Sequence, residues 1–278
     1  MSHENSLIGW PREPLRGCIG IPKPEIGLSM LFCLSEPFKS LVKRLHEVDV
    51  SQVELLDEGL HRLQNNRIKT LKKLAESKGL RLTLHSPFAD INIASPNPVL
   101  RNTILKLQRK SIVHAHQLDC QVWVFHPGLK TGISSFYPGK EWQLNLESVK
   151  TLLRFAREYD VNITIENVPE PHPFLMKSAQ DFSRFYNELE EDVGLTLDIG
   201  HANLNNQIQS FIIDFSDKIV HVHVSDNNGI HDNHLGIGYG NIDWESVAET
   251  IKEVGYNKVI TLELSLIHIS EPTRQAEI

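Results

Sequence analysis

The sequence has few cysteines, no long apolar run and no excess of positive charge. Its three cysteines, Cys18, Cys33 and Cys120, are far apart and form no CxxC pair, so we expect no disulfide framework and a reducing, cytoplasmic setting. No apolar run approaches the roughly 20 residues that cross a bilayer, and no signal-peptide pattern opens the chain, so no membrane partner is predicted. The formal net charge of −7 offers no basic field for nucleic acid.

The chain does contain a regular alternation of short β-branched segments and longer helical patterns. Eight strands are predicted, at residues 26–31, 52–56, 80–85, 122–126, 161–166, 194–198, 219–224 and 259–263. Helical patterns follow the first seven, at residues 37–48, 66–79, 95–118, 141–159, 178–191, 209–216 and 243–255. Alternation of this kind implies parallel strands with crossover helices, and eight units fit a (β/α)₈ TIM barrel. No glycine-rich phosphate loop follows the first strand, which disfavours a nucleotide-binding sheet.

Local signals mark several boundaries. Gly79 is a helix stop, Ser95 is a plausible N-cap of the third helix, and Ser178 with Asp181 has the spacing of a capping box. Residues 1–25 are rich in proline and are interpreted as an irregular leader, and residues 26–263 as the barrel. Residues 131–142 are long enough to form a lid over a site.

The last segment, "LSLIHISEPTRQAEI" at residues 264–278, resembles the translation of a transposase-type sequencing-library adapter. We therefore exclude it from fold reasoning as a non-native tail. It lacks a helical stripe: "LSLIHIS" alternates like a strand, and Pro272 interrupts the rest. The barrel is thus predicted to lack a native eighth helix of the usual length.

Carboxylates and imidazoles end six consecutive predicted strands. The residues are His85, His126, Glu166, Asp198 with His201 beyond it, His223 with Asp232 and His234 in the following loop, and Glu263. In a (β/α)₈ barrel the carboxyl ends of all strands lie on one rim, where active sites form. Gathered carboxylates would repel one another there unless a divalent cation joined them. The pattern predicts a metal site, whereas five other histidines are assigned structural roles: His46, His61, His114, His116 and His172.

The motifs themselves resemble a known superfamily. "LHSPFADINIASPN", "VWVFHPG", "ITIENVP", "LTLDIGHAN", "HVHVSDNNGIHDNHLGIGYGNIDW" and "ITLEL" are similar, in order and spacing, to the sugar phosphate isomerase/epimerase superfamily with the xylose isomerase-like TIM barrel. That superfamily also contains the endonuclease IV family of apurinic/apyrimidinic endonucleases. The resemblance runs from about Ile26 to Glu263.

The isomerase branch of the resemblance implies one divalent ion, Mn²⁺, Mg²⁺, Co²⁺ or Zn²⁺. Its ligands would be Glu166, Asp198, His223 and Glu263. The ion would hold two adjacent oxygens of a sugar or sugar phosphate and stabilise the enediolate, while Glu166 and Glu263 exchange the proton as catalytic residues. His201 and His85 would bind the substrate.

The endonuclease branch implies three zinc ions that hydrolyse a phosphodiester. Its further ligands would be His85, His126, His201, Asp232 and His234, in addition to the four above. Phe88 and Ala89 replace the tyrosine and leucine that probe the DNA stack in that family, and the strand-one start "IGLSMLF" also departs from its pattern. These departures and the negative charge favour the isomerase.

Three points stay open at this stage. An arginine that binds the sugar in some epimerases has no obvious counterpart in "SDNNGIHD", a departure that counts against a ketose 3-epimerase in particular. The sequence also names no particular sugar. A metal barrel that binds a sugar without catalysis is a third reading. The oligomeric state, a homo-oligomer included, is not fixed by the sequence.

Overall fold

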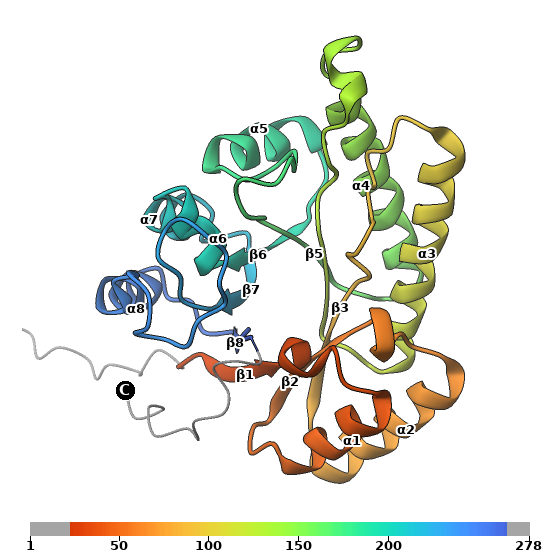
Figure 1. Ribbon diagram of the computed structural model, residues 1–278, viewed down its shortest axis with the longest axis vertical. Helices are drawn as coiled ribbons and strands as arrows, with labels where there is room; N and C mark the ends of the chain where they lie inside the picture. The colour runs from red at the N-terminus through yellow and green to blue at the C-terminus, as the bar shows by residue number, and fades with distance from the viewer. Residues whose placement is uncertain (1–22, 266–278) are drawn as a thin grey trace, which may run out of the picture.

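A computed structural model of the protein describes residues 23–265, and within them eight parallel strands close into a barrel. Strand order follows the chain, each strand pairs with the next, and β1 pairs with β8 to complete the closure (Figure 1). The strands are β1 (Glu25–Ser29), β2 (Gln52–Leu56), β3 (Arg81–His85), β4 (Val122–Phe125), β5 (Ile163–Glu166), β6 (Gly194–Asp198), β7 (Ile219–Val224) and β8 (Val259–Leu262). All eight predicted strands and the predicted TIM barrel are confirmed.

Helices lie around most of the barrel (Figure 1), but β1 is less covered, since Ile26 is 51% exposed. They are α1 (Phe38–Glu47), α2 (Asn65–Lys78), α3 (Pro98–Gln117), α4 (Lys140–Glu158), α5 (Ala179–Leu189), α6 (Ile199–Leu204), α7 (Ile208–Asp214) and α8 (Trp244–Glu253). The described part of the chain also has three short 3₁₀ helices in its loops, η1 (Met30–Cys33), η2 (Gly59–His61) and η3 (Gly132–Ser135). Two helices, α6 and α7, join β6 to β7; the shorter one, α6, begins directly at the strand end.

The helix boundaries follow from local chemistry. The capping box predicted for α5 is present: the Ser178 hydroxyl accepts from the Asp181 amide, and the Asp181 carboxylate accepts from the Ser178 amide. Gly79 ends α2 at φ +66°, a conformation that glycine adopts without penalty. Ser95 was the wrong N-cap for α3, because the Asn97 side chain accepts from the first free amides and Pro98 occupies the first turn.

The inside of the barrel carries polar residues in register with the strand ends. Side chains of a strand alternate between its two faces, so residues two apart share a face. Trp123 points outward, since its indole donates to Ser111 of α3 at 3.1 Å. Inward, Thr164 and Thr196 of adjacent strands lie 2.6 Å apart through their hydroxyl oxygens, and both are fully buried. Each of these threonines lies two residues before a strand-terminal carboxylate. Polar residues precede three other rim residues by the same spacing: Thr83 before His85, His221 before His223 and Thr261 before Glu263.

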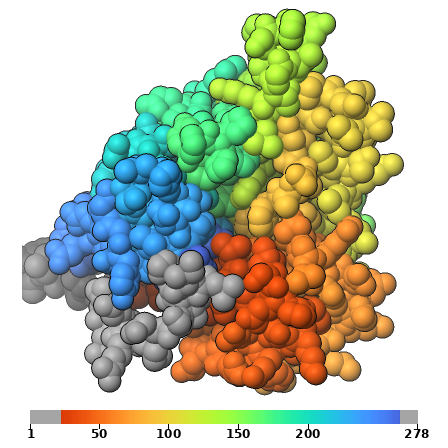
Figure 2. All heavy atoms as spheres, in the orientation of Figure 1, coloured from red at the N-terminus to blue at the C-terminus, as the bar shows by residue number. Residues whose placement is uncertain are grey.

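The segment before α4 projects from the body of the molecule. It is the lime-green region at the top of the space-filling view, where it stands clear of its surroundings (Figure 2). The Glu141 carboxylate fixes its base by accepting from the hydroxyls of Thr131 and Ser134 at 2.8 and 2.7 Å. At its tip Phe136 and Tyr137 are 76% and 63% exposed. Its role as a lid stays a prediction.

Some expectations fall on residues that the structure does not describe. Residues 1–22 of the predicted leader and residues 266–278 of the suspected adapter tail lie outside the described part, so the missing final helix is not tested. Cys33 and Cys120, the two cysteines within residues 23–265, are in no disulfide. No helix among these residues is long and apolar enough to cross a membrane.

Gly128 allows two loops to pack at the rim of the barrel. A Cβ at this position would lie 2.3 Å from the Cβ of Ala94 and 2.8 Å from its backbone nitrogen. The Gly128 amide also donates to the Asn145 side chain at 2.8 Å, which fixes the turn after β4. The Cβ and the backbone atoms of Ala94 cannot be moved by a side-chain rotation, so a clash at this place would require a shift of the backbone.

We predict that Gly128→Ala destabilises the protein by about 1–3 kcal/mol, the usual cost of overpacking. Gly132→Ala is the matched control, because a Cβ there meets nothing within 4 Å, and its effect should stay within about 0.5 kcal/mol. Urea unfolding followed by circular dichroism measures both. Equal stabilities of the two variants would contradict the packing argument.

Candidate metal centre

The structure brings all nine predicted rim residues together at the carboxyl end of the barrel. Three end their strands (His85, Glu166 and Asp198), two lie one residue beyond theirs (His126 and Glu263), and His223 lies within β7. His201 is in the first turn of α6, and Asp232 and His234 are in the loop after β7. Because parallel strands end on one side, positions up to 178 residues apart in sequence converge here, as the sequence predicts.

The ligand-type atoms of the site form three groups across the rim. Within each group, one side-chain nitrogen or oxygen per residue lies within 4.8 Å of all the others. The groups are His85, His126 and Glu166; Glu166, Asp198, His223 and Glu263; and His201, Asp232 and His234. Glu166 belongs to two of them, so the first two groups are contiguous.

Glu166 divides its two oxygens between these two groups. Its Oε2 lies 3.2 Å from Nε2 of His85 and 3.2 Å from Nε2 of His126. Its Oε1 faces the other way and lies 3.3 Å from Nδ1 of His223. That ring nitrogen is also 3.4 Å from Oε2 of Glu263. A carboxylate placed in this way can bridge two cations.

Three histidines of the site are oriented by backbone carbonyl groups. A carbonyl oxygen only accepts, so the ring nitrogen facing it carries the hydrogen, and in the neutral ring the opposite nitrogen presents its lone pair to the site. The pairs are His85 Nδ1 with Ser86 at 2.9 Å, His201 Nδ1 with Asn167 at 2.8 Å, and His234 Nδ1 with Glu263 at 2.9 Å. The fold therefore sets these rings in the tautomer that ligates metals through Nε2.

The third group is held in place by the segment after β7. Asp232 Oδ2 lies 3.2 Å from Nε2 of His201 and 3.2 Å from Nε2 of His234. Asp226, which also follows β7, belongs to none of the groups. Its carboxylate accepts from the Gly238 amide and from the indole of Trp244, both at 2.9 Å, and so fixes the far end of this loop.

Burial and mutual repulsion govern the carboxylates of the site. Burial alone would raise the pKa of Glu166, but the imidazoles around it, His223 foremost, hold that pKa well below its ordinary value. Burial raises the pKa of Asp198 and of Glu263, and the nearby charge of Glu166 adds to the effect in both. Burial and the charge of Glu166 thus both disfavour the ionised forms of Asp198 and Glu263.

The imidazoles respond in the opposite direction. Burial opposes the charge on His85, but Glu166 outweighs it and raises the pKa of His85 to about 9. Asp232 does the same for His234, whose pKa also rises to about 9. Protons thus neutralise the site in the absence of metal, and a cation would have to displace them.

The donor set fits divalent cations. An imidazole lone pair and a carboxylate oxygen at 3.2 Å repel unless a proton or a cation lies between them. Asp198 Oδ2 and Asp232 Oδ1 are buried atoms without a hydrogen-bond partner among the described residues, as expected of ligand atoms. The mixture of nitrogen and carboxylate donors suits zinc, manganese or cobalt.

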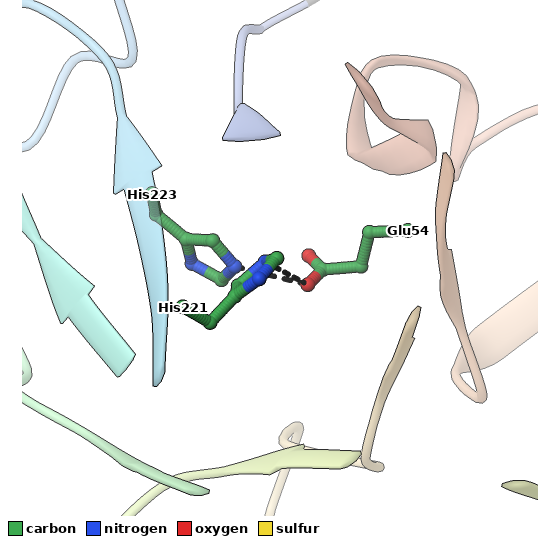
Figure 3. A group of neighbouring side chains, drawn as sticks. All are labelled: Glu54, His221 and His223. Atoms are coloured by element: carbon green, nitrogen blue, oxygen red, sulfur yellow. Dashed lines mark hydrogen bonds and ion pairs between the residues drawn. The ribbon is translucent and has the colours of Figure 1, made fainter. Parts of the chain in front are cut away.

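Sequence reasoning missed two residues beneath the rim. Glu54 lies in the middle of β2 and His221 lies two residues before His223, and both are 1% exposed. Glu54 reaches across the barrel interior to both histidines (Figure 3). A signal was present: an acid in the apolar strand "QVELL", and an alternation "HVH" that places both histidines on one face.

Two of the histidines assigned structural roles make structural contacts. His114 Nδ1 lies 2.9 Å from Oδ2 of Asp57, whose other oxygen accepts from the Leu63 amide at 2.7 Å. His61 Nε2 lies 3.1 Å from the carbonyl oxygen of Glu36. Neither is in one of the rim groups.

Comparison with known proteins gives consistent relatives. A family model described as "Xylose isomerase-like TIM barrel" matches residues 42–277. Uncharacterized protein MJ1311 of Methanocaldococcus jannaschii is 32% identical over 243 residues, which is 86% of this chain and 83% of that protein. A crystal structure of a D-tagatose 3-epimerase-like protein has a TM-score of 0.81 and 32% identity, and covers 86% of this chain and 90% of its own.

More distant relatives come from two enzyme classes. D-psicose 3-epimerase of Ruminiclostridium cellulolyticum is 22% identical and covers 81% of this chain and 78% of its own length. A probable endonuclease 4 of Aquifex aeolicus is 26% identical and covers 66% of this chain and 69% of its own length.

We predict that metal ions stabilise the protein after treatment with EDTA. Binding at 1,000 times the dissociation constant adds about 4 kcal/mol, which for a chain of this size raises Tm by about 7 °C. Mn²⁺, Co²⁺ and Zn²⁺ should be tested by calorimetry, with metal content counted by mass spectrometry. Affinity should rise from pH 6 to pH 8, because protons on His85 and His234 compete with the metal.

Glu263→Gln should weaken this stabilisation, because it removes a charged ligand from the four-residue group. The control is Glu188→Gln, a carboxylate of α5 that pairs with Arg184 away from the rim. An unchanged Tm with every ion in the wild-type protein would contradict the metal assignment.

Proposed function

The chain belongs to the xylose isomerase-like TIM barrel family, and from this premise we propose that it is a divalent-metal-dependent sugar or sugar-phosphate isomerase or epimerase. The observation that carries the proposal is the buried group of Glu166, Asp198, His223 and Glu263. Relatives described as D-psicose 3-epimerase and D-tagatose 3-epimerase-like support the same class.

The proposed reaction moves a proton from a carbon atom next to a carbonyl group. A cation held by the four residues would bind adjacent oxygens of the keto sugar and stabilise the negative charge that develops on them. Glu166 on β5 and Glu263 after β8 enter the site from different sides of the barrel. In the proposal one carboxylate takes the proton from one face of the carbon, and the other returns a proton to the opposite face.

The low solvent exposure of the four-residue group supports a small substrate. Glu166 and Asp198 are 1% and 0% exposed, whereas the side chains of His126, Asp232 and His234 are 18–20% exposed. A substrate would therefore pass the more exposed His126, Asp232 and His234 to reach the four-residue group. We assign the inward-facing Nε2 of His85 and of His201 to contacts with the sugar hydroxyls.

A second candidate is a zinc-dependent phosphodiester hydrolase of the endonuclease IV type. The observation that favours it is the sharing of Glu166 between two contiguous groups, with His201, Asp232 and His234 as a third. Such an arrangement would suit three cations and hydrolysis by an activated water.

The DNA-binding features of that candidate are weak in this chain. The ring of Phe88 packs against His85 and His126, with centroids 5.4 and 5.9 Å apart, instead of standing free above the rim. Exposed Ala89 follows, and Glu58 accepts from both of their amides at 3.0 Å. The rim therefore offers an acidic loop and a small side chain where a duplex would need basic groups.

The test is to incubate the Mn²⁺- or Co²⁺-loaded protein with ketoses such as D-tagatose and D-psicose in D₂O. We expect deuterium at a carbon atom of the product, because a carboxylate that carries the proton exchanges it with solvent. Glu166→Gln should lower kcat by about 10³-fold and leave the fold intact, whereas Glu188→Gln should leave kcat unchanged.

The competing readings give different results in the same set of assays. Zinc-dependent nicking of abasic duplex DNA without turnover of any ketose would establish the hydrolase instead. Saturable binding of a ketose without exchange or turnover would support a barrel that only binds sugars.

A further inference from the structure

His223 is the histidine of the four-residue group, and its ring is oriented differently from those of three other rim histidines. His85, His201 and His234 each direct Nδ1 to a backbone carbonyl, which leaves Nε2 facing the site. His223 instead directs its outer nitrogen, Nε2, to a carboxylate: Oε2 of Glu54 lies 3.0 Å away. Its inner nitrogen, Nδ1, faces Glu166 and Glu263. The imidazole of the four-residue group, His223, is thus paired with a carboxylate instead of a backbone carbonyl.

Glu54 is itself held by the layer below the rim. Its Oε2 also lies 3.3 Å from Nε2 of His221 (Figure 3). That nitrogen is in turn 3.1 Å from Oγ1 of Thr261. Glu54, His221 and His223 are 0–1% exposed. One carboxylate oxygen, Oε2, therefore faces a ring nitrogen of each histidine, and the carboxylate is fixed between two rings of one strand.

We infer that Glu54 is a positioning residue for the metal: it accepts the Nε2 hydrogen of His223 and so keeps the Nδ1 lone pair directed at the site. A carboxylate in this place also increases the electron density of the ring, which strengthens it as a ligand. His221 and Thr261 keep the carboxylate in register. The inference rests on the metal-dependent function proposed above.

A cation between Glu54, His221 and His223 is the alternative use of the same atoms. It would need the Nε2 lone pair of His223, and the ring would then have to lose its last hydrogen to ligate through Nδ1 as well. The 3.0 Å contact is a normal length for a charge-assisted hydrogen bond. The three side chains are also sealed from solvent. The geometry therefore favours a hydrogen bond at this place.

The experiment compares Co²⁺ affinity of metal-free wild-type protein with that of Glu54→Gln and Glu54→Ala, followed by visible absorption of the bound ion. Loss of a partner of this kind weakens metal affinity by about 10–100-fold. We expect Glu54→Ala near the upper end, and Glu54→Gln near the lower end, because its amide oxygen still accepts the hydrogen.

Asp57→Asn is the matched control. Asp57 follows β2 directly, is 4% exposed and pairs with a buried histidine, His114, at 2.9 Å. The variant therefore breaks a carboxylate–histidine pair of the same chemistry outside the rim groups. The backbone amide of Asp57 donates to the carbonyl oxygen of His85 at 3.0 Å, a bond that the side-chain substitution does not remove. Its Co²⁺ affinity and absorption should match the wild type, whatever it does to Tm.

A second measurement needs no variant. Two-dimensional ¹H–¹⁵N NMR of the zinc-loaded wild-type protein should show His223 with its hydrogen on Nε2, protected from exchange. A hydrogen on Nδ1, or a ring with none, would overturn the inference. So would equal Co²⁺ affinity of Glu54→Ala and wild type. A wild-type protein that binds no divalent cation would instead overturn the proposed function.

Discussion

The burial of negative charge at the carboxyl end of the barrel is the constraint on which the rest of the structure depends. Glu166, Asp198 and Glu263 are at most 5% exposed and close enough for one ligand atom of each to reach the others within 4.8 Å. Such a cluster is costly unless positive charge compensates it. Imidazoles and protons can do so in part, and the divalent cation that we propose would do so with the geometry that the rings already have.

The barrel supplies the rigidity that this compensation requires. Strand closure brings the nine side chains to one rim, backbone carbonyls set three imidazole rings, and Asp226 fixes the loop that carries Asp232 and His234. A glycine at residue 128 lets the loop after β4 pack closely against Ala94 in the loop after β3. The polar layer below, with Thr164, Thr196 and Glu54, is unusual for a barrel interior, which branched apolar side chains commonly fill, and here it supports the ligands above.

One scaffold of this kind can serve two chemistries, and the number of cations separates them. A single ion in the four-residue group suits proton transfer on a keto sugar, whereas the two flanking groups would extend the site for phosphodiester hydrolysis. Glu166 is the residue through which the two arrangements are connected, because its oxygens face different groups. The surroundings, with Phe88 packed on the histidines and Glu58 beside it, support the proposal of a small-molecule substrate.

The sequence by itself determined the eight strands, their parallel order and the place of the nine rim residues. The alternation of strand and helix patterns determines the strands and their parallel order. The carboxyl ends of all strands in such a barrel lie on one rim, so a residue that ends a strand lies there. Local sequence was less decisive at the start of α3, where Asn97 and not Ser95 caps the helix, because two suitable residues competed within three positions. Only the tertiary structure decided that Glu166 is shared, which nitrogen of each ring faces inward, and that Glu54 reaches His223 across 169 positions of sequence. Period-two alternation assigns a side chain to a face of its strand, but the partner it meets depends on barrel closure and on rotamers set by neighbours far away in the chain.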